Sequence, residues 1–388
     1  MIQRHIAAYV RKVAKGYPAV AITGPRQAGK TTLARALFPD HPYVSLENLD
    51  DREFALTDPR GFLAKYEQGA IFDEIQHCPD LCSYLQGVLD ARSTRGRFIL
   101  TGSQQFGVMS RITQSLAGRV ALVHLLPFAY DEVYAAAPSL NQVLFAGLYP
   151  PVHDRQLDPG DWLAHYVQTY VERDVRQLLG VRDLNTFQKF VRLCAGRTGQ
   201  LLNLSQLGTD AGITHNTAKA WLSILEASYL VFLLPPHHAN FNKRLIKSPK
   251  LYFYDTGLAA YLLGIREPEQ LETHPLRGAL FETWVQAELR KMRFNHGHAS
   301  DWYFWRDQEG LEVDALFDRG GDLIPVEIKT GTTLNADFFK GLTAWIKLAQ
   351  PSKPLAYLIY GGTGNQVRQG IQVLGWKDLN QINPHLAK

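Results

Sequence analysis

Residues Ala19 to Leu33 read AVAITGPRQAGKTTL, and this stretch decides the fold of the N-terminal part of the chain. The apolar run Ala19–Ile22 is typical of a short buried strand. The segment from Gly24 to Thr31 matches the pattern G-x-x-x-x-G-K-[ST], and apolar residues at helical spacing follow. A strand, a glycine-rich loop and a helix in this order predict a phosphate-binding loop, because backbone N–H groups and the helix dipole then face an anion.

The residues of this loop have distinct expected parts in binding ATP and Mg²⁺. Gly24 and Gly29 allow the backbone to approach the phosphate chain closely. Lys30 is expected to reach the β- and γ-phosphates, and the Thr31 hydroxyl to hold Mg²⁺. The alternative is a chance glycine-rich loop, and the intact motif in its required context argues against it. The full set of residues expected at the nucleotide is Gly24, Pro25, Arg26, Gln27, Ala28, Gly29, Lys30, Thr31 and Thr32.

The composition limits the class of protein. With 388 residues, 46% of them hydrophobic and 20% charged, the chain predicts two or three folded domains rather than disorder. The net charge of +4 permits a nucleic-acid partner without arguing for one. Of three cysteines, Cys78 and Cys82 lack a second pair at zinc-ligand spacing, which disfavours a zinc site. Few cysteines and no long apolar run favour a cytoplasmic protein without a membrane span.

Strand and helix signals alternate through residue 125 and predict a parallel sheet covered on both faces. A helix is expected over residues 2–15, with Arg4, Arg11, Lys12 and Lys15 on a solvated face. A strand at 43–46, a helix at 59–66 and another helix at 81–89 are expected next. In such a sheet the site lies at the carboxyl ends of the strands.

A second acidic motif, Gly69-Ala70-Ile71-Phe72-Asp73-Glu74, ends a predicted buried strand. It resembles the second nucleotide motif of phosphate-loop ATPases. Asp73 would then hold Mg²⁺ through water, and Glu74 would polarise the attacking water. The alternative is an ordinary strand that ends in surface acids.

Two further positions are candidates for contact with the γ-phosphate. The strand 97–103 ends in small polar residues, of which Ser103, or else Thr101, would sense the γ-phosphate; a simple turn cap is the alternative. Arg119, with Arg111 in reserve, would stabilise transition-state charge in its own subunit or in a neighbouring one. A surface salt bridge is the alternative for Arg119.

Residues 1 to about 135 resemble the AAA-type ATPase module of a large bacterial and archaeal family of uncharacterised ATPases. The segments that carry this resemblance are GPRQAGKT, IFDEIQ, ILTGSQQF and SLAGRVALVHLLPF. In that family the module precedes a C-terminal domain of unknown function, and the position of Arg119 belongs to a Gly-Arg signature. A ring is compatible with this class, and the sequence leaves the oligomeric state open.

The middle of the chain predicts a winged helix-turn-helix. Helices are expected at 161–179 and 187–195, followed by a helix capped by Ser205, a turn at Gly212 and a second helix capped by Thr214. A β-rich run and a basic hairpin over 241–250 would form the wing. In a DNA complex the hairpin would grip phosphate, and the alternative is a scaffold module. The residues involved are His215, Asn216, Thr217 and Lys219 for the major groove, and Lys243, Arg244, Lys247 and Lys250 for phosphate.

The C-terminal part predicts a helix at 280–289 and strands at 302–306, 312–317 and 324–330. Glu327 and Lys329 are two apart on one strand and therefore share a face. Asp314 on the preceding strand could join them. We expect Asp314 and Glu327 to hold Mg²⁺, and Lys329 to orient the water and to stabilise developing charge during phosphodiester cleavage.

This pattern resembles the restriction-endonuclease-like superfamily, whose signature is an Asp followed by (Asp/Glu)-x-Lys. Glu282, on the preceding helix, matches an accessory acid of many members, whereas Val313 departs from the proline often found there. The predicted helix at 338–348 and the strand at 355–360 fit the same fold. The alternative is a solvated hairpin with a salt bridge between Glu327 and Lys329.

The sequence thus predicts an α/β protein with an AAA-type ATPase domain at 1–135, a helical linker at 136–200, a winged helix-turn-helix at 201–272 and a restriction-endonuclease-like domain at 273–388. The expected function is ATP binding and hydrolysis on or with nucleic acid, DNA above all, with Mg²⁺-dependent nuclease activity in the last domain. One alternative is an ATP-driven switch that binds a protein partner and carries an inert nuclease-like domain. A second alternative is a nucleic-acid-binding module with vestigial hydrolysis.

Overall fold

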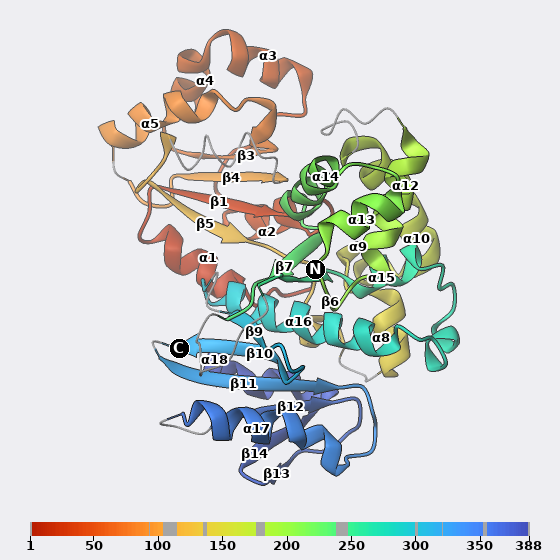
Figure 1. The fold of residues 1–388 in the computed structure, drawn as a ribbon. Coiled ribbons are helices and arrows are strands. Elements are labelled where there is room, and N and C mark those ends of the chain that lie inside the picture. Colours follow the sequence, from red (N-terminus) through yellow and green to blue (C-terminus); the bar gives the residue numbers. More distant parts are fainter. Residues whose placement is uncertain are drawn as a thin grey trace.

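The computed structural model describes residues 2–92, 94–103, 115–134, 138–175, 183–237, 247–298, 302–319, 321–351 and 355–386. The described chain contains a five-stranded, a three-stranded and a six-stranded sheet. In Figure 1 the red-to-orange N-terminal sheet lies at the top, the green middle helices lie beside it, and the blue C-terminal sheet lies at the bottom.

The N-terminal sheet is parallel throughout, in the order β2-β3-β4-β1-β5. Successive residues of its central strand β1 point to opposite faces. Val20 and Ile22 pack with α1 and α2, whereas Ala19 and Ala21 pack with α4 and α5 on the other side. The elements are α1 Ala7–Ala14, β1 Ala19–Gly24, α2 Lys30–Leu37, β2 Tyr43–Ser45, α3 Leu49–Thr57, α4 Pro59–Lys65, β3 Ala70–Asp73, η1 Ile75–His77, α5 Leu81–Ala91, β4 Phe98–Ser103 and β5 Val120–His124. The expected parallel sheet is confirmed.

The middle of the chain is mainly helical. It comprises α7 Tyr130–Val133, α8 Leu140–Ala146, α9 Pro150–Asp154, α10 Pro159–Tyr166, the π-helix η2 Val167–Val175, α12 Leu184–Ala195, α13 Leu204–Ala211, α14 His215–Ala227, α15 Thr256–Leu262 and η3 Pro268–Glu272. A small antiparallel sheet, ordered β6-β8-β7, is formed by β6 Gln200–Leu201, β7 Val231–Leu234 and β8 Lys250–Phe253.

The helix pair α13–α14 agrees with the sequence prediction except at one cap. Gly212 ends α13 in the left-handed region at φ 82°, and Thr214 caps α14 through the Thr217 N–H. The cap of α13, however, is Asn203, whose side chain accepts from the Gln206 N–H, and not Ser205. The expected helix at 161–179 also differs, because α10 continues as the π-helix η2.

The C-terminal sheet has the order β13-β14-β12-β11-β10-β9. Strands β9, β10 and β11 form an antiparallel meander, whereas β12 is parallel to β11 and to β14. The long helix α16 precedes the meander, and α17 connects β11 to β12. The bounds are α16 Arg277–Asn295, β9 Trp302–Arg306, β10 Glu312–Arg319, β11 Asp322–Lys329, η4 Ala336–Phe339, α17 Lys340–Ala349, β12 Tyr357–Tyr360, β13 Gln366–Arg368, β14 Ile371–Gly375, η5 Trp376–Ile382 and α18 Asn383–Leu386.

The middle and C-terminal parts share one hydrophobic core, whereas the N-terminal sheet has cores of its own. Helix α16 is buried on several sides, and Figure 1 places it between the middle elements and the C-terminal sheet. Trp284 of α16 contacts Tyr130 and Trp376, with ring centroids 5.8 Å apart in each pair. Shared burial of this kind ties the middle domain to the C-terminal domain. Among the described helices, none is both long and apolar enough to cross a membrane.

Candidate functional site

The phosphate loop connects β1 to α2, as the motif requires. Gly24 has φ 155°, and a Cβ there would lie 1.9 Å from the carbonyl oxygen of Leu125, so only glycine fits beside β5. Gly29 is the N-cap of α2 and adopts the left-handed region at φ 88°. These two glycines place the N-terminus of α2, whose first N–H groups have no partner within the helix, at the mouth of the loop.

Lys30 is buried at the centre of this loop. Its Nζ donates to the carbonyl oxygens of Gly24 at 3.2 Å and Pro25 at 2.8 Å. Burial lowers the pKa of Lys30, although Glu74 and Asp73 act in the opposite direction. A pocket of about 320 Å³ opens beside it and is lined by Arg26, Gln27, Gly29, Lys30, Thr31, Thr32, Glu47 and Glu74. Most of the predicted loop residues thus line one cavity, and Glu47 is a member that the sequence did not indicate.

Asp73 lies at the carboxyl end of β3, and its carboxylate accepts hydrogen bonds from three hydroxyl groups. The Thr31 hydroxyl donates to its two oxygens at 2.9 and 3.0 Å, the Tyr43 hydroxyl donates at 2.8 Å, and Thr101 also donates to it. A hydroxyl and a carboxylate side by side at the loop fit Mg²⁺ held between the protein and a nucleotide, because Mg²⁺ prefers oxygen ligands. Thr31 and Asp73 are therefore well placed for the predicted metal position.

Glu74 and Ser103 are brought together by a residue that the sequence did not single out. Glu74 has φ 56°, a left-handed conformation that is costly for a non-glycine residue and common at active sites. The Gln76 amide donates to Glu74 and, at 3.0 Å, to the Ser103 hydroxyl at the tip of β4. Gln76 therefore links the strand β4 to the carboxylate expected to polarise water. Only its place in the IFDEIQ segment could have pointed to it.

Arg119 does not lie at the phosphate loop of its own chain. It precedes β5, where Val120 pairs with Ala19, whereas the loop follows Gly24 at the other end of β1. A strand of that length places the two ends about 16 Å apart. The guanidinium instead pairs with Asp90, with Nε–Oδ1 at 2.5 Å and Nη2–Oδ2 at 2.9 Å. The predicted action within the same subunit is thus not possible in this arrangement, and action on a neighbouring subunit stays a prediction. Arg111 lies outside the described residues.

Arg4 was expected on a solvated face, and this expectation is wrong. Its side chain is 9% exposed and forms an ion pair with Glu132, with Nε–Oε2 at 3.1 Å. Its Nη1 donates to the Ala28 carbonyl of the phosphate loop at 2.9 Å, and its Nη2 to the Leu126 carbonyl at 2.7 Å. Arg4 therefore connects the loop to the segment that follows β5. Arg11, Lys12 and Lys15 are exposed, as expected.

The predicted nucleic-acid residues of the middle domain lie in different environments. His215, Asn216 and Lys219 are exposed at the start of α14, and Thr217 is half-buried. Lys243 and Arg244 of the basic hairpin lie outside the described residues, whereas Lys247 is exposed. Lys250, the last of that group, is 3% exposed and cannot contact phosphate in this arrangement.

The C-terminal candidates meet at one point, as the sequence predicted. Asp314 comes from β10, Glu327 and Lys329 from β11, and Glu282 from α16. Asp314 accepts from the Ile328 N–H at 2.8 Å, and Lys329 donates to Glu327. Glu312 of β10 joins them. We call Glu282, Glu312, Asp314 and Glu327, with Lys329, the carboxylate cluster.

Lys250 enters this cluster from the middle domain, which the sequence did not indicate. Its Nζ lies 2.9 Å from Glu282 Oε1 and 3.9 Å from Asp314 Oδ1, and it forms a closer pair with Glu312. Burial alone would lower the pKa of Lys250, but the surrounding carboxylates raise it. Among the described residues, no group of three or more His, Cys, Asp or Glu side chains has an arrangement that could hold a metal ion. The cluster, with an ammonium among its acids, therefore does not fit the Mg²⁺ that Asp314 and Glu327 were expected to bind.

Two acids of the cluster, Glu282 and Glu327, have raised pKa values. Burial raises the pKa of Glu282 to about 7, against the opposing charge of Lys250. Burial and the neighbouring Asp314 raise the pKa of Glu327 to about 8. One Glu327 oxygen, Oε2, is buried with no hydrogen-bond partner. Perturbed acids with unsatisfied oxygens are typical of functional sites.

A buried polar group joins the N-terminal and middle domains next to the phosphate loop. The Tyr229 hydroxyl lies 3.1 Å from Thr23 Oγ1 and 2.6 Å from His124 Nδ1. Burial, together with the nearby Arg290, lowers the pKa of His124 to about 4. Thr23 precedes Gly24 in β1, and Tyr229 lies two residues before β7. The loop and the small middle sheet are thus in direct contact.

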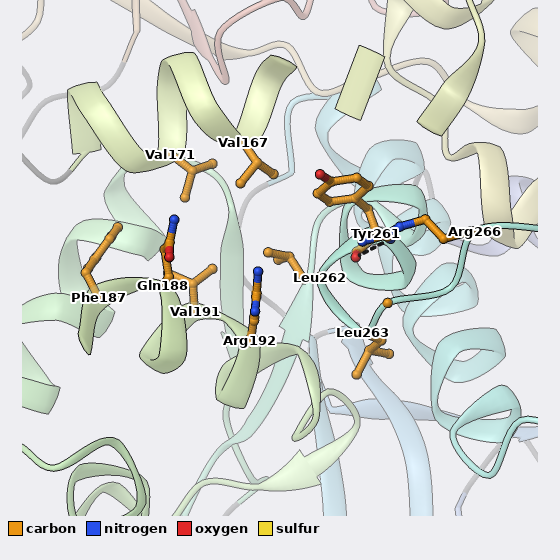
Figure 2. A pocket seen from close by; sticks show the side chains of 11 residues that line it. Val167, Val171, Phe187, Gln188, Val191, Arg192, Tyr261, Leu262, Leu263 and Arg266 are labelled. Carbon is orange, nitrogen blue, oxygen red and sulfur yellow. Dashed lines mark hydrogen bonds between the residues drawn. The ribbon is translucent and has the colours of Figure 1, made fainter. Parts of the chain in front are cut away.

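A separate pocket of about 320 Å³ lies within the middle domain. Figure 2 shows Val167 and Val171 on one side, Gln188 and Arg192 of α12 on the other, and the residues after Tyr261 closing one end. None of the predicted site residues lines this pocket. It therefore belongs to neither the phosphate loop nor the carboxylate cluster.

Comparison with protein families divides the chain into three. Residues 16–134 match an AAA domain, residues 137–269 match the domain of unknown function DUF8612, and residues 277–379 match the domain of unknown function DUF4143. The AAA match contains the phosphate loop, Asp73 and Glu74, and supports ATP binding and hydrolysis by the N-terminal domain. The domain that contains the carboxylate cluster has no function attached to its family.

Individual proteins also resemble this chain. Among solved structures, a Walker-type ATPase of Pyrococcus abyssi is 15% identical with a TM-score of 0.42, and the match covers 68% of this chain and 96% of that one. Uncharacterized protein Rv2008c of Mycobacterium tuberculosis and uncharacterized protein Mb2031c of Mycobacterium bovis are each 33% identical over 336 residues, which is 85% of this chain and 74% of theirs. The chain therefore belongs to the same family as these two mycobacterial proteins, and its own residues 16–134 match an AAA domain.

Proposed function

We propose that the protein is an ATP-driven enzyme acting on nucleic acid, in which the AAA domain controls a nuclease-type centre formed by the carboxylate cluster. ATP would bind at the phosphate loop, with Mg²⁺ held by Thr31 and Asp73. Glu74 would polarise the attacking water, and Ser103 would contact the γ-phosphate.

The observation that carries this proposal is that the small middle sheet contacts both centres. Tyr229, just before β7, reaches Thr23 beside the phosphate loop. Strand β8, which pairs with β7, carries Lys250 and Tyr252, and both side chains contact Glu282 in the cluster. The Tyr252 hydroxyl lies 2.5 Å from Glu282 Oε1. A change in the loop on ATP binding or hydrolysis therefore has a continuous packed connection to the cluster.

Two features support nucleic acid as the substrate. The cluster combines acids and Lys329 on a helix, meander, helix and parallel strand, the arrangement that the restriction-endonuclease-like resemblance implies. Lys329 is 35% exposed and could stabilise charge on a phosphate at the rim. The exposed polar start of α14 offers a second contact surface.

A second candidate function is an ATP-driven switch that binds a protein partner and whose C-terminal domain is inert. Lys250 favours this alternative, because its ammonium neutralises the acids that a nuclease would need. In that case the carboxylate cluster would be a buried ion-pair network that fastens the middle domain to the C-terminal domain.

Cleavage assays with the full chain test the proposal. The protein is incubated with plasmid DNA, linear DNA and RNA, with Mg²⁺ or Mn²⁺, with and without ATP. We expect ATP-dependent cutting that is lost in Asp314→Asn and in Lys329→Met, while ATP turnover is kept. An absence of cutting under every condition, with normal ATP turnover, would contradict the nuclease proposal and favour the protein switch.

A further inference from the structure

The position of Lys250 within the cluster resembles that of a bound cation. Its ammonium is held by oxygens of Glu282, Glu312 and Asp314, which come from α16 and β10. Its side chain is 4% exposed. An ammonium has three donors, so three carboxylates match its capacity.

Lys250 belongs to another part of the fold than the acids that surround it. It is the first residue of β8 and pairs across the small middle sheet with Leu234 and Leu201. The Tyr252 hydroxyl, from the same strand, also reaches Glu282. The acids themselves all lie in the C-terminal domain, so the position of β8 decides whether they have this cation.

Lys250 is the cation that three of these acids share. Four carboxylates face the two ammonium groups of Lys250 and Lys329, and Arg306 reaches Glu312 from the rim with Nη1–Oε2 at 2.9 Å. Without Lys250 the buried acids would lack their central partner, and buried carboxylates need one. Grouped carboxylate oxygens are the ligands that Mg²⁺ and Mn²⁺ prefer.

We propose that Lys250 is an internal competitor for a divalent-cation site formed by Glu282, Glu312 and Asp314, so that the cluster accepts Mg²⁺ or Mn²⁺ only when the ammonium leaves. The misfit between the predicted metal site and the observed cluster then has a cause: the site is closed by this chain's own lysine. The biological meaning of this inference rests on the proposed nuclease-type centre, but metal binding is measured independently of cutting.

The test is a Mn²⁺ titration of the full chain without nucleotide. Calorimetry and electron paramagnetic resonance of free Mn²⁺ monitor the binding. We compare wild type with Lys250→Met and with the control Lys291→Met, which removes another buried lysine paired with an acid, Glu288. We expect Lys250→Met to gain one Mn²⁺ site at least tenfold tighter than any binding to the cluster in the wild type. The control should bind as the wild type does.

The added site must also depend on the acids. We expect the double variant with Lys250→Met and Asp314→Asn to lose it. Lys250→Gln, which keeps hydrogen-bond donors without the charge, serves as the second variant, and circular dichroism establishes that each variant is folded. Equal Mn²⁺ binding by wild type and folded Lys250 variants would overturn the proposal.

A wild-type measurement needs no variant. Reductive methylation with formaldehyde and a borohydride reductant, measured by mass spectrometry, should leave Lys250 unmodified without Mn²⁺ and modify it progressively as the Mn²⁺ concentration is raised. The same extent of Lys250 modification at all Mn²⁺ concentrations would overturn the proposal. If Mn²⁺-loaded Lys250→Met cuts no nucleic acid, the proposed function fails while this inference stands.

Discussion

Lys30 and Lys250 are both buried lysines at the centre of a candidate site, but their partners are opposite in kind. Lys30 donates to two backbone carbonyls, whereas Lys250 lies among three carboxylates. Burial lowers the pKa of Lys30, and the surrounding acids raise the pKa of Lys250.

This difference indicates which of the two centres, the phosphate loop or the carboxylate cluster, can accept a ligand. Neutral carbonyls hold an ammonium weakly, so a phosphate can replace them and gain a charge-assisted hydrogen bond. The three carboxylates around Lys250 already neutralise its ammonium group, so another cation must first displace that ammonium. The phosphate loop is therefore open to its ligand, whereas the carboxylate cluster is closed.

The largest expected effect is at the open centre. Lys30→Ala removes the ammonium group that would exchange its two carbonyl contacts for a phosphate. We therefore expect ATP turnover to fall by about a hundredfold or more, as when a transition-state donor is lost. Steady-state phosphate release measures this. Lys12→Ala, an exposed lysine on α1, is the control and should turn over ATP normally. Turnover by Lys30→Ala at the wild-type rate would refute the phosphate-loop assignment.

The next effect concerns what holds the open loop in place. Arg4→Ala leaves Glu132, 1% exposed, as a buried carboxylate without its ion pair. We expect the free energy of unfolding to fall by about 3 to 5 kcal/mol, together with weaker ATP binding because Ala28 loses its contact. Urea unfolding and nucleotide titration measure the two effects. Arg11→Ala, exposed on α1, should change neither; equal behaviour of both variants would contradict the assigned contact.

The connection between the two centres should depend on pH through His124. Its pKa in the folded state is about 4 against an ordinary 6.5. The unfolded chain therefore binds more protons between these values, so this contribution to stability is complete above pH 6.5 and is lost as the pH falls toward 4. We expect His124→Asn to reduce the slope of unfolding free energy in this range by up to about 1.4 kcal/mol per pH unit. An unchanged slope, with exposed His215→Asn as the reference, would contradict the burial of His124.

The smallest expected effect is at the other member of that connection. Tyr229→Phe removes the hydroxyl that lies between Thr23 and His124 while keeping the ring, and we expect a loss of about 1 kcal/mol in unfolding free energy. If the connection carries the ATP signal, the same variant should keep ATP turnover but lose the ATP dependence of cutting. Tyr17→Phe, at a tyrosine 40% exposed, is the control. An equal loss of unfolding free energy in both variants would show that the Tyr229 hydroxyl makes no specific contribution between the domains.

The sequence predicted the parts of each site that are local in the chain. The phosphate loop is one continuous motif, and Asp73 and Glu74 follow a recognisable buried strand. Asp314, Glu327 and Lys329 lie on neighbouring strands of one hairpin, so their convergence followed from strand periodicity. The positions of many strands and helices followed from the same patterns, whereas α3, α15, β13 and β14 were not predicted.

Contacts between distant parts of the chain were not predictable in this way. Arg4 pairs with a residue 128 positions away, and Lys250 with Glu282, 32 positions away in another domain. Both looked like solvated or phosphate-binding basic residues, because a basic side chain has no pattern that announces a buried acid beside it. The apolar run that follows Lys250, Leu251 to Phe253, was the one available signal that this lysine begins a buried strand.

The most direct test of the contrast between the two lysines is a crystal structure with Mn²⁺ and a non-hydrolysable ATP analogue, in which anomalous scattering locates the metal. In the wild type with Lys250 seated among the acids, we predict Mn²⁺ at the phosphate loop beside Thr31 and Asp73 and none in the carboxylate cluster; in Lys250→Met we predict Mn²⁺ at both. Mn²⁺ bound among Glu282, Glu312 and Asp314 with Lys250 still in place, or a cluster without Mn²⁺ in the variant, would contradict it.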